Sequence, residues 1–156
     1  MDYIHDLRPY IGHKKIILCA AACVIIKDDM ILLQRRSDNN KWGIIGGLLE
    51  LDETFEEAAH REVEEETGLK VKFDYFLGIY HHFDMKWANE DEAHNICAVY
   101  KASVISGEPR IDSESFELRW FKLDELPPIA ATDHRLAVEA YIKGIKYPLL
   151  NENKKG

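Results

Sequence analysis

The chain has 156 residues, of which 46% are hydrophobic and 31% charged, as is ordinary for a single globular domain. Its formal net charge of −8 argues against binding to a nucleic-acid backbone, because phosphates attract basic surfaces. No apolar run approaches the roughly 20 residues that span a bilayer, and the opening MDYIHDLRPY has no apolar signal core. We therefore expect a cytoplasmic protein whose partners include neither a membrane nor a nucleic acid.

The first part of the chain predicts a leader and two strands. In the leader, residues 1–15, Asp2–Tyr10 is expected to form a helical turn that ends near Pro9. The long apolar run Ile16–Ile26 is rich in β-branched residues, which indicates a buried strand. Turns are then predicted at Lys27–Asp29 and Asp38–Asn40, with a returning strand between them at Met30–Gln34.

A glutamate-rich helix is expected over Phe55–Thr67. Thr54 and Glu57 have the spacing of a capping box, which marks the helix start, and Gly68 is the residue type that commonly ends a helix. The elements expected after it are strands at Val71–Tyr80, Ile96–Ile105 and Phe116–Phe121, a last helix at Thr132–Lys143, and a polar tail at 147–156.

The three cysteines carry no recognisable metal or redox motif. Cys19, Cys23 and Cys97 include no C-x-x-C pair, and no His or Cys partner sits at zinc-ligand spacing. Cys19 and Cys23 are four residues apart on a predicted strand and therefore point to the same face. We expect all three to be buried structural thiols.

The predicted helix places some glutamates where a solvent-facing helix does not. An apolar arc that should dock on a core consists of Phe55, Ala58, Ala59 and Val63. The opposite, solvated face consists of Glu56, Glu57, His60 and Glu64. Glu62 and Glu66 fall inside the apolar arc, and Glu65 lies at its edge. Spacings of three and four residues bring these three carboxylates within about 5–6 Å of one another.

Such a group of carboxylates is costly unless a cation binds it. Two carboxylates about 5 Å apart repel by about 3 kcal/mol at an effective dielectric near 20, and burial adds to this cost. Mg²⁺ prefers oxygen ligands and is usually held by a few carboxylates, water and substrate phosphates. Most acidic runs on helices are simply solvated surface, but the position of Glu62 and Glu66 favours a cation site.

The segment from Gly47 to Leu69 matches the pattern G-x5-E-x7-R-E-U-x-E-E-x-G-U, where U is aliphatic, at every specified position. This pattern is the Nudix box, and the chain resembles the MutT/Nudix hydrolase family over about residues 16 to 143. The chain departs from the family at Ile45, where proline is usual, and at Asp52, where glycine is common. Neither position is a metal ligand in the family, so the departures concern loop shape and substrate fit.

The resemblance implies an α/β fold, the Nudix α/β/α sandwich with a mixed β-sheet between helical layers, over residues 16–146. It also implies that Mg²⁺ or Mn²⁺ is coordinated by Glu62, Glu65 and Glu66, helped by the carbonyl of Gly46. Glu53 and Arg61 are expected to hold the loop against the helix as an ion pair. The general base varies within the family, and the candidates are Glu62, Glu90, Asp91, Glu92 and Glu114.

Other residues are candidates for binding the substrate. Arg35 and Arg36 end a strand near the expected site, and one of them is a candidate to clamp a phosphate, since a guanidinium matches phosphate geometry. Trp42 is expected either to stack on a base or to belong to the core. The segment Asp84–Glu92 is expected to be exposed, either as a loop that brings an acid and Trp87 over the site or as a solvated hairpin tip. Glu114 completes the candidate substrate-binding set.

By resemblance, the chain is a divalent-metal-dependent pyrophosphohydrolase that cleaves a nucleoside diphosphate linked to some moiety X. Nucleoside triphosphates, nucleotide sugars and dinucleotide polyphosphates all remain open as substrates. ADP-ribose-specific members tend to carry a proline roughly 16 residues past the box, and no proline lies between Pro9 and Pro109. The alternatives are a nucleotide-sensing, non-catalytic Nudix domain and an enzyme acting on the 5′ end of RNA. Dimers are common in the family, which favours a homodimer.

Overall fold

The computed structural model describes residues 2–113 and 115–145. Glu114 and the predicted polar tail 147–156 therefore lie outside the described residues. In chain order the elements are α1 (Tyr3–Ile11), β1 (Ile16–Lys27), β2 (Met30–Arg36), β3 (Trp42–Gly43), β4 (Ile45–Leu48), α2 (Phe55–Thr67), β5 (Lys70–Lys86), β6 (Glu92–Ser106), β7 (Ser115–Lys122) and α3 (Thr132–Lys143). No helix among these residues is long and apolar enough to cross a membrane.

The strands form one mixed sheet whose central strand is β1. The order is β3-β2-β1-β6-β5, and β7 pairs with β2. β1 runs parallel to β6 over Ile16–Ile26 and antiparallel to β4 over Ala20–Cys23. It pairs with β2 only at its far end, from Ile26 onward. The edge of β1 opposite β6 is therefore shared by two strands. β2 pairs with its last residues, and β4, which contains the Gly46-Gly47 pair, pairs with its middle.

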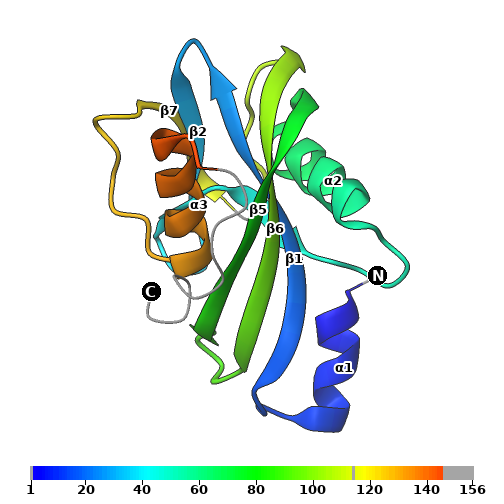
Figure 1. Cartoon of the computed structure of the whole chain (residues 1–156). Helices are drawn as coiled ribbons and strands as arrows, with labels where there is room; N and C mark the ends of the chain where they lie inside the picture. The colour runs from blue at the N-terminus through cyan, green and yellow to red at the C-terminus, as the bar shows by residue number, and fades with distance from the viewer. Residues whose placement is uncertain (1, 114, 146–156) are drawn as a thin grey trace.

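Helices cover both faces of this sheet, which confirms the predicted α/β/α sandwich. Figure 1 shows α2 on one side of the sheet and α3 on the other. Alternate residues of β1 supply the two cores, with Ala22 and Val24 in the core beneath α3 and Ala21 and Cys23 in the core beneath α2. Strand β1 is hence buried on both faces, as its unbroken apolar run predicts.

The structure corrects three of the predicted boundaries. The leader helix does not end near Pro9 but continues to Ile11 and ends at Gly12. Strands β5 and β6 extend well beyond the predicted ranges, because their antiparallel pairing continues to Lys86 and Glu92. Only the turn between them, residues 87–91, remains of the loop expected at Asp84–Glu92. The short strands β3 and β4 were not predicted as separate elements.

The prediction of three buried thiols is wrong for Cys19. Cys23 and Cys97 are buried, and burial raises the pKa of both thiols. Cys19 is exposed, although it points to the same face of β1 as Cys23. The core beneath α2 begins at Ala21, so the first part of β1 extends past the helix that covers this face.

Both ends of α2 are those expected from the sequence. The Thr54 hydroxyl accepts a bond from the Glu57 amide at 3.1 Å, and the Glu57 carboxylate accepts one from the Thr54 amide at 2.8 Å. At the other end Gly68 adopts a left-handed conformation, with φ of 71°. These local bonds fix the rotation of the helix at its first turn, and with it the face that each glutamate occupies.

Replacing Thr54 by alanine should lower the free energy of unfolding by about 1 kcal/mol, because the helix loses its capping hydroxyl. Urea denaturation monitored by circular dichroism measures the change. Thr132→Ala is the matched control, since α3 starts without a side-chain capping bond. Equal destabilisation by the two substitutions would contradict a specific role for the cap.

Candidate metal and phosphate site

The three candidate carboxylates differ in burial as the helical arc predicts. Glu62 is 9% exposed and Glu66 only 1%, whereas Glu65 is exposed at the edge of the arc. Glu64, on the opposite face of the same helix, is exposed as well. Two ionisable groups thus lie on the side of α2 that packs toward the sheet. Burying a carboxylate costs free energy unless it is paired, so this arrangement is not expected for acids that serve only as solvated surface.

The Glu62 carboxylate packs directly against the backbone of β4. A Cβ atom added at Gly47 would collide with the carboxylate oxygens of Glu62. Gly46, beside it, is equally close to the backbone of Ala21 and to Ala22 in β1. The Gly-Gly pair is therefore required by close approach on both sides: β4 fits against β1, and the acid of α2 fits against β4.

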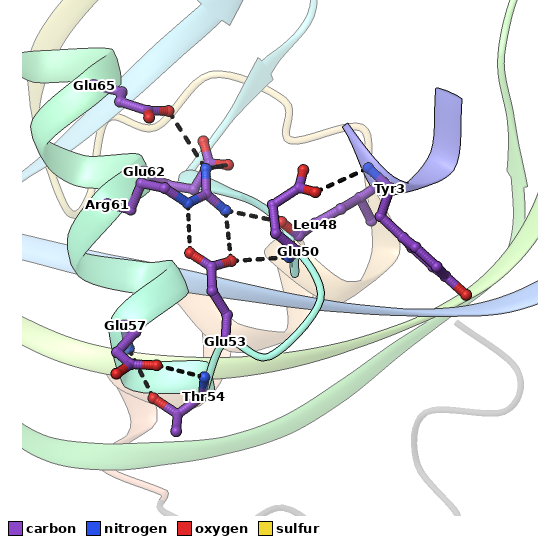
Figure 2. Close-up of polar contacts among 9 residues, drawn as sticks. All are labelled: Tyr3, Leu48, Glu50, Glu53, Thr54, Glu57, Arg61, Glu62 and Glu65. Atoms are coloured by element: carbon purple, nitrogen blue, oxygen red, sulfur yellow. Dashed lines mark hydrogen bonds and ion pairs between the residues drawn. The ribbon is translucent and has the colours of Figure 1, made fainter. Parts of the chain in front are cut away.

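Arg61 joins the loop before α2 to the carboxylates on the helix, as Figure 2 shows. Its Nε lies 2.6 Å from one oxygen of Glu53, and its Nη2 donates to the other oxygen at 2.9 Å. The same Nη2 donates to the carbonyl of Leu48 at 3.1 Å. Nη1 donates to Glu62 at 2.8 Å and to Glu65 at 3.4 Å. The expected Glu53–Arg61 pair is present, and Arg61 also contacts two of the three candidate ligands.

The acids of this network have pKa values displaced in opposite directions. Burial raises the pKa of Glu62, and the bond and charge of Arg61 oppose this effect without cancelling it. The hydrogen bond from Arg61 lowers the pKa of Glu53, because it favours the ionised carboxylate. The Glu53 side chain is consequently ionised at neutral pH. For Glu62, burial disfavours the ionised form.

The donor set fits a hard divalent cation, but its geometry is not that of a closed cage. No group of three His, Cys, Asp or Glu side chains within residues 2–113 and 115–145 has metal-ligand geometry. The carboxylate oxygens of Glu62 and Glu65 both contact the Arg61 guanidinium. Their oxygen chemistry and burial suit Mg²⁺ or Mn²⁺. The Gly46 carbonyl, in the adjoining strand, is a proposed fourth ligand.

Gln34 is a residue of the site that the sequence did not reveal. It is 1% exposed in the second half of β2, and its amide Nε2 donates to Glu66 at 3.3 Å. Its carbonyl oxygen accepts a bond from the hydroxyl of Ser115 at 2.6 Å. A single polar residue at the end of the apolar run Met30–Leu33 was the available signal. Gln34 orients the most deeply buried of the three carboxylates.

Arg35 and Arg36, one of which is predicted to clamp a phosphate, follow Gln34 directly. Arg35 donates to Asn40 at 2.6 Å and lies 3.4 Å from Glu117, while Arg36 pairs with both oxygens of Asp38. Each guanidinium is thus already engaged by a neighbouring side chain. A phosphate would have to share these donors or displace their partners.

Trp42 is partly buried at the edge of the core. It packs against the core beneath α3, makes an edge contact with Phe121 at 5.0 Å and lies under the guanidinium of Arg119. Of the two roles expected for this residue, packing agrees with these contacts, and base stacking stays a prediction.

The candidate residues Trp87, Glu90, Asp91 and Glu92 lie at the β5–β6 turn. Glu90 pairs with Lys86 at 2.9 Å, and Asp91 pairs with Arg8 and His13 of the leader. Trp87 and Asp91 line a hollow that Leu48 also borders. The structure therefore connects the turn to the leader, a contact that the sequence did not indicate. Glu114 is not among the described residues, so its role stays a prediction.

A second buried polar cluster lies on the α3 face of the sheet. The Asn95 amide donates to Asp133 at 3.0 Å, and His82 lies 3.9 Å from the same carboxylate. Within the described part of the chain, the Asn95 side-chain oxygen and the Tyr80 hydroxyl are buried without a hydrogen-bond partner. This cluster was not predicted, although an asparagine within the apolar strand β6 was its signal.

A NUDIX domain family model matches residues 18–141, and the chain therefore belongs to the Nudix family. The match includes the whole of β1 to β7 apart from the first residues of β1, together with most of α3. The fold and the position of the box residues on β4 and α2 agree with this membership.

Curated relatives carry several different activities in their names. The chain is 37% identical over 102 residues to an ADP-ribose pyrophosphatase of Methanocaldococcus jannaschii, a match covering 65% of this chain and 57% of the relative. It is 37% identical over 91 residues to a MutT-like protein of Streptomyces ambofaciens, covering 58% and 53%. The chain thus spans about half the length of these relatives.

Solved structures show the same fold. A MutT Nudix hydrolase of Burkholderia pseudomallei is 33% identical, with a TM-score of 0.67 over 79% of this chain and 96% of that one. A MutT protein of Methanosarcina mazei superposes with a TM-score of 0.72 over 84% and 96% of the two chains at 24% identity, a likeness of fold alone.

Replacing Glu53 by glutamine should lower the free energy of unfolding at neutral pH by about 1–3 kcal/mol, because Arg61 loses a charged acceptor. The pKa of Glu53 is lowered in the folded protein, so its stabilisation is present above the ordinary glutamate pKa. The difference between wild type and variant should shrink as the pH falls through this lowered value. Urea titrations at several pH values measure it.

Glu139→Gln is the matched control, because Glu139 pairs with Arg135 at 3.7 Å on the exposed surface of α3. Its loss should change the free energy of unfolding by less than about 0.5 kcal/mol. A Glu53→Gln effect no larger than that of the control would show that Arg61 does not depend on Glu53.

Proposed function

We propose that this protein is a divalent-metal-dependent pyrophosphohydrolase that cleaves a phosphoanhydride bond in a nucleoside diphosphate derivative. The observation that carries the proposal is the burial of Glu62 and Glu66 against β4 and β2, where ionised carboxylates are costly without a cation. Membership of the Nudix family and the complete box support the same activity.

The proposed metal ligands are Glu62, Glu65, Glu66 and the Gly46 carbonyl. Bound Mg²⁺ or Mn²⁺ supplies charge neutralisation for the phosphates and makes a coordinated water more acidic. Arg61 contacts both Glu62 and Glu65, and its bonds to Glu53 and the Leu48 carbonyl would hold it in place if these two acids bound a cation instead. Among the candidate bases, Glu62 is supported by its position, since its carboxylate packs against Gly47 of β4 beside the other proposed ligands.

The proposed substrate is a nucleoside triphosphate, a nucleotide sugar or a dinucleotide polyphosphate. One relative is named an ADP-ribose pyrophosphatase and others are named oxidised purine nucleoside triphosphate hydrolases, so the names of the relatives do not converge on one compound. The absence of a proline between Pro9 and Pro109 weighs against ADP-ribose. We place the activity in the cytoplasm and propose a homodimer.

Glu65→Gln and Glu66→Gln should each lower turnover by at least about 100-fold, because each substitution removes a charged metal ligand. A panel of nucleotides assayed for phosphate or pyrophosphate release in Mg²⁺ and Mn²⁺ measures this. Glu64→Gln is the matched control, since Glu64 lies on the exposed face of the same helix and should retain wild-type rates. Circular dichroism checks that the fold is intact.

Wild-type turnover in the Glu65→Gln and Glu66→Gln variants would mean that the ligands are assigned wrongly. An absence of turnover in the wild-type protein on the whole panel would favour the alternative, a nucleotide-sensing Nudix domain that does not hydrolyse its ligand.

Millimolar Mg²⁺ or Mn²⁺ should raise the melting temperature, because a cation that binds only the native state stabilises it. The increase should be lost on addition of EDTA and reduced in Glu66→Gln, but kept in Glu64→Gln. Differential scanning fluorimetry provides the measurement. A melting temperature indifferent to either cation would argue against the proposed site.

A further inference from the structure

We infer that the hollow between α1 and the β5–β6 turn binds the nucleobase of the substrate, an inference that rests on the proposed function. We call this hollow the leader pocket. Its walls come from α1, the turn residues 87–91 and Leu48 of β4, and its volume is about 280 Å³. The α1 and turn walls lie outside the Nudix box, so the box alone does not account for the pocket.

The leader pocket begins next to the proposed metal site. Leu48 borders it and follows Gly47, the residue against which Glu62 packs. The carbonyl of Leu48 accepts a bond from Arg61, so the same residue faces both sites. A nucleotide whose phosphates reach Glu62 would therefore have its nucleoside within reach of this pocket.

Polar contacts hold the two walls together. Arg8 of α1 lies 3.2 Å from Asp91 of the turn, and its Nη2 donates to the Glu92 carbonyl at 3.0 Å. His13 contacts the same Asp91 at 2.7 Å. The side chains of Arg8 and Asp91 are only 12% and 13% exposed, so this pair is shielded by the structure around it. The pocket is consequently a formed feature and not a gap beside a loose segment.

A second set of contacts joins α1 to the box loop. The Tyr3 amide donates to the Glu50 carboxylate at 2.8 Å, and the Glu50 amide donates to Glu53, the partner of Arg61. Figure 2 shows this sequence of contacts from α1 to the carboxylates of α2. It fixes the position of the leader pocket relative to Glu62.

The chemistry of the lining suits a flat heteroaromatic ring. Trp87, Ile4 and Leu48 offer aromatic and aliphatic surface on which a base can stack. His5 places an imidazole at the same hollow, which can hydrogen-bond to the edge of a base, whereas the side chain of Asn89 is already bonded to Asp91. The charged groups of the lining are mixed, with Asp2 and Asp91 beside His5 and Arg8, and Arg8 is paired with Asp91, so these charges largely offset one another.

The size of the leader pocket limits what it accepts. Its volume of about 280 Å³ lies just below the range of about 300–1,000 Å³ that is typical of pockets for drug-sized ligands. One base with its ribose fits this volume, and a whole dinucleotide does not. The pocket therefore recognises one nucleoside, and the remaining part of a larger substrate lies outside it.

Binding without turnover tests the inference directly. Nucleoside 5′-monophosphates and ribose 5-phosphate are titrated into the full chain in EDTA by isothermal calorimetry. At least one nucleotide should bind at least about tenfold more tightly than ribose 5-phosphate. Trp87→Ala should lower its affinity about tenfold, the loss expected for one stacked base, whereas Trp87→Phe should keep it within about threefold.

Trp120→Phe is the control, because Trp120 packs against the core beneath α2 and does not line the pocket. It should bind nucleotides as the wild type does. Where the wild type hydrolyses a nucleotide, Trp87→Ala should raise KM about tenfold and leave kcat within about threefold.

The inference that the leader pocket binds a nucleobase would be overturned by either of two results. One is equal binding of ribose 5-phosphate and every nucleotide at millimolar concentration, and the other is unchanged nucleotide binding by Trp87→Ala. Base-dependent binding that requires Trp87 in a wild-type protein without turnover would support the pocket while contradicting the proposed hydrolysis. Turnover with an unchanged KM in Trp87→Ala would support the proposed hydrolysis and contradict nucleobase binding in the leader pocket.

Discussion

The structure depends on one guanidinium placed between a loop and a helix. Arg61 contacts Glu53, the Leu48 carbonyl, Glu62 and Glu65, and only a planar group with five donors can serve four acceptors in this way. Glu53 and Arg61 are separated by seven residues because the chain needs that length to turn from the loop into the second turn of α2. The box pattern thus describes a three-dimensional contact as well as a set of ligands.

Around Arg61, burial within the fold opposes the ionisation of the carboxylates that a metal ion requires. Burial raises the pKa of Glu62, so the ionised acid that a metal requires is the form that the folded chain disfavours. Arg61 offsets part of this cost through its own positive charge. The absence of a side chain at Gly47 permits the close packing that produces the effect.

Local rules were enough to predict α2, and non-local pairing explains the failures. The capping box and Gly68 lie within the helix and its ends, so both boundaries and the burial of Glu62 followed from the sequence. The lengths of β5 and β6 were wrong because each strand is extended by its partner rather than by its own pattern. Gln34 was missed because a lone glutamine has no periodicity that would indicate its contact with α2.

The leader helix is attached in a manner unlike the rest of the fold. None of its residues is buried, and the contacts that hold it are hydrogen bonds and ion pairs, chiefly those of Arg8 and Tyr3. Charge pairs near a surface weaken as dissolved ions accumulate around them, whereas apolar packing does not. The Arg8–Asp91 pair, whose side chains are only 12% and 13% exposed, is screened much less than the His13–Asp91 pair, in which His13 is 65% exposed. Dissolved ions therefore act unequally on the two contacts that hold this wall of the leader pocket.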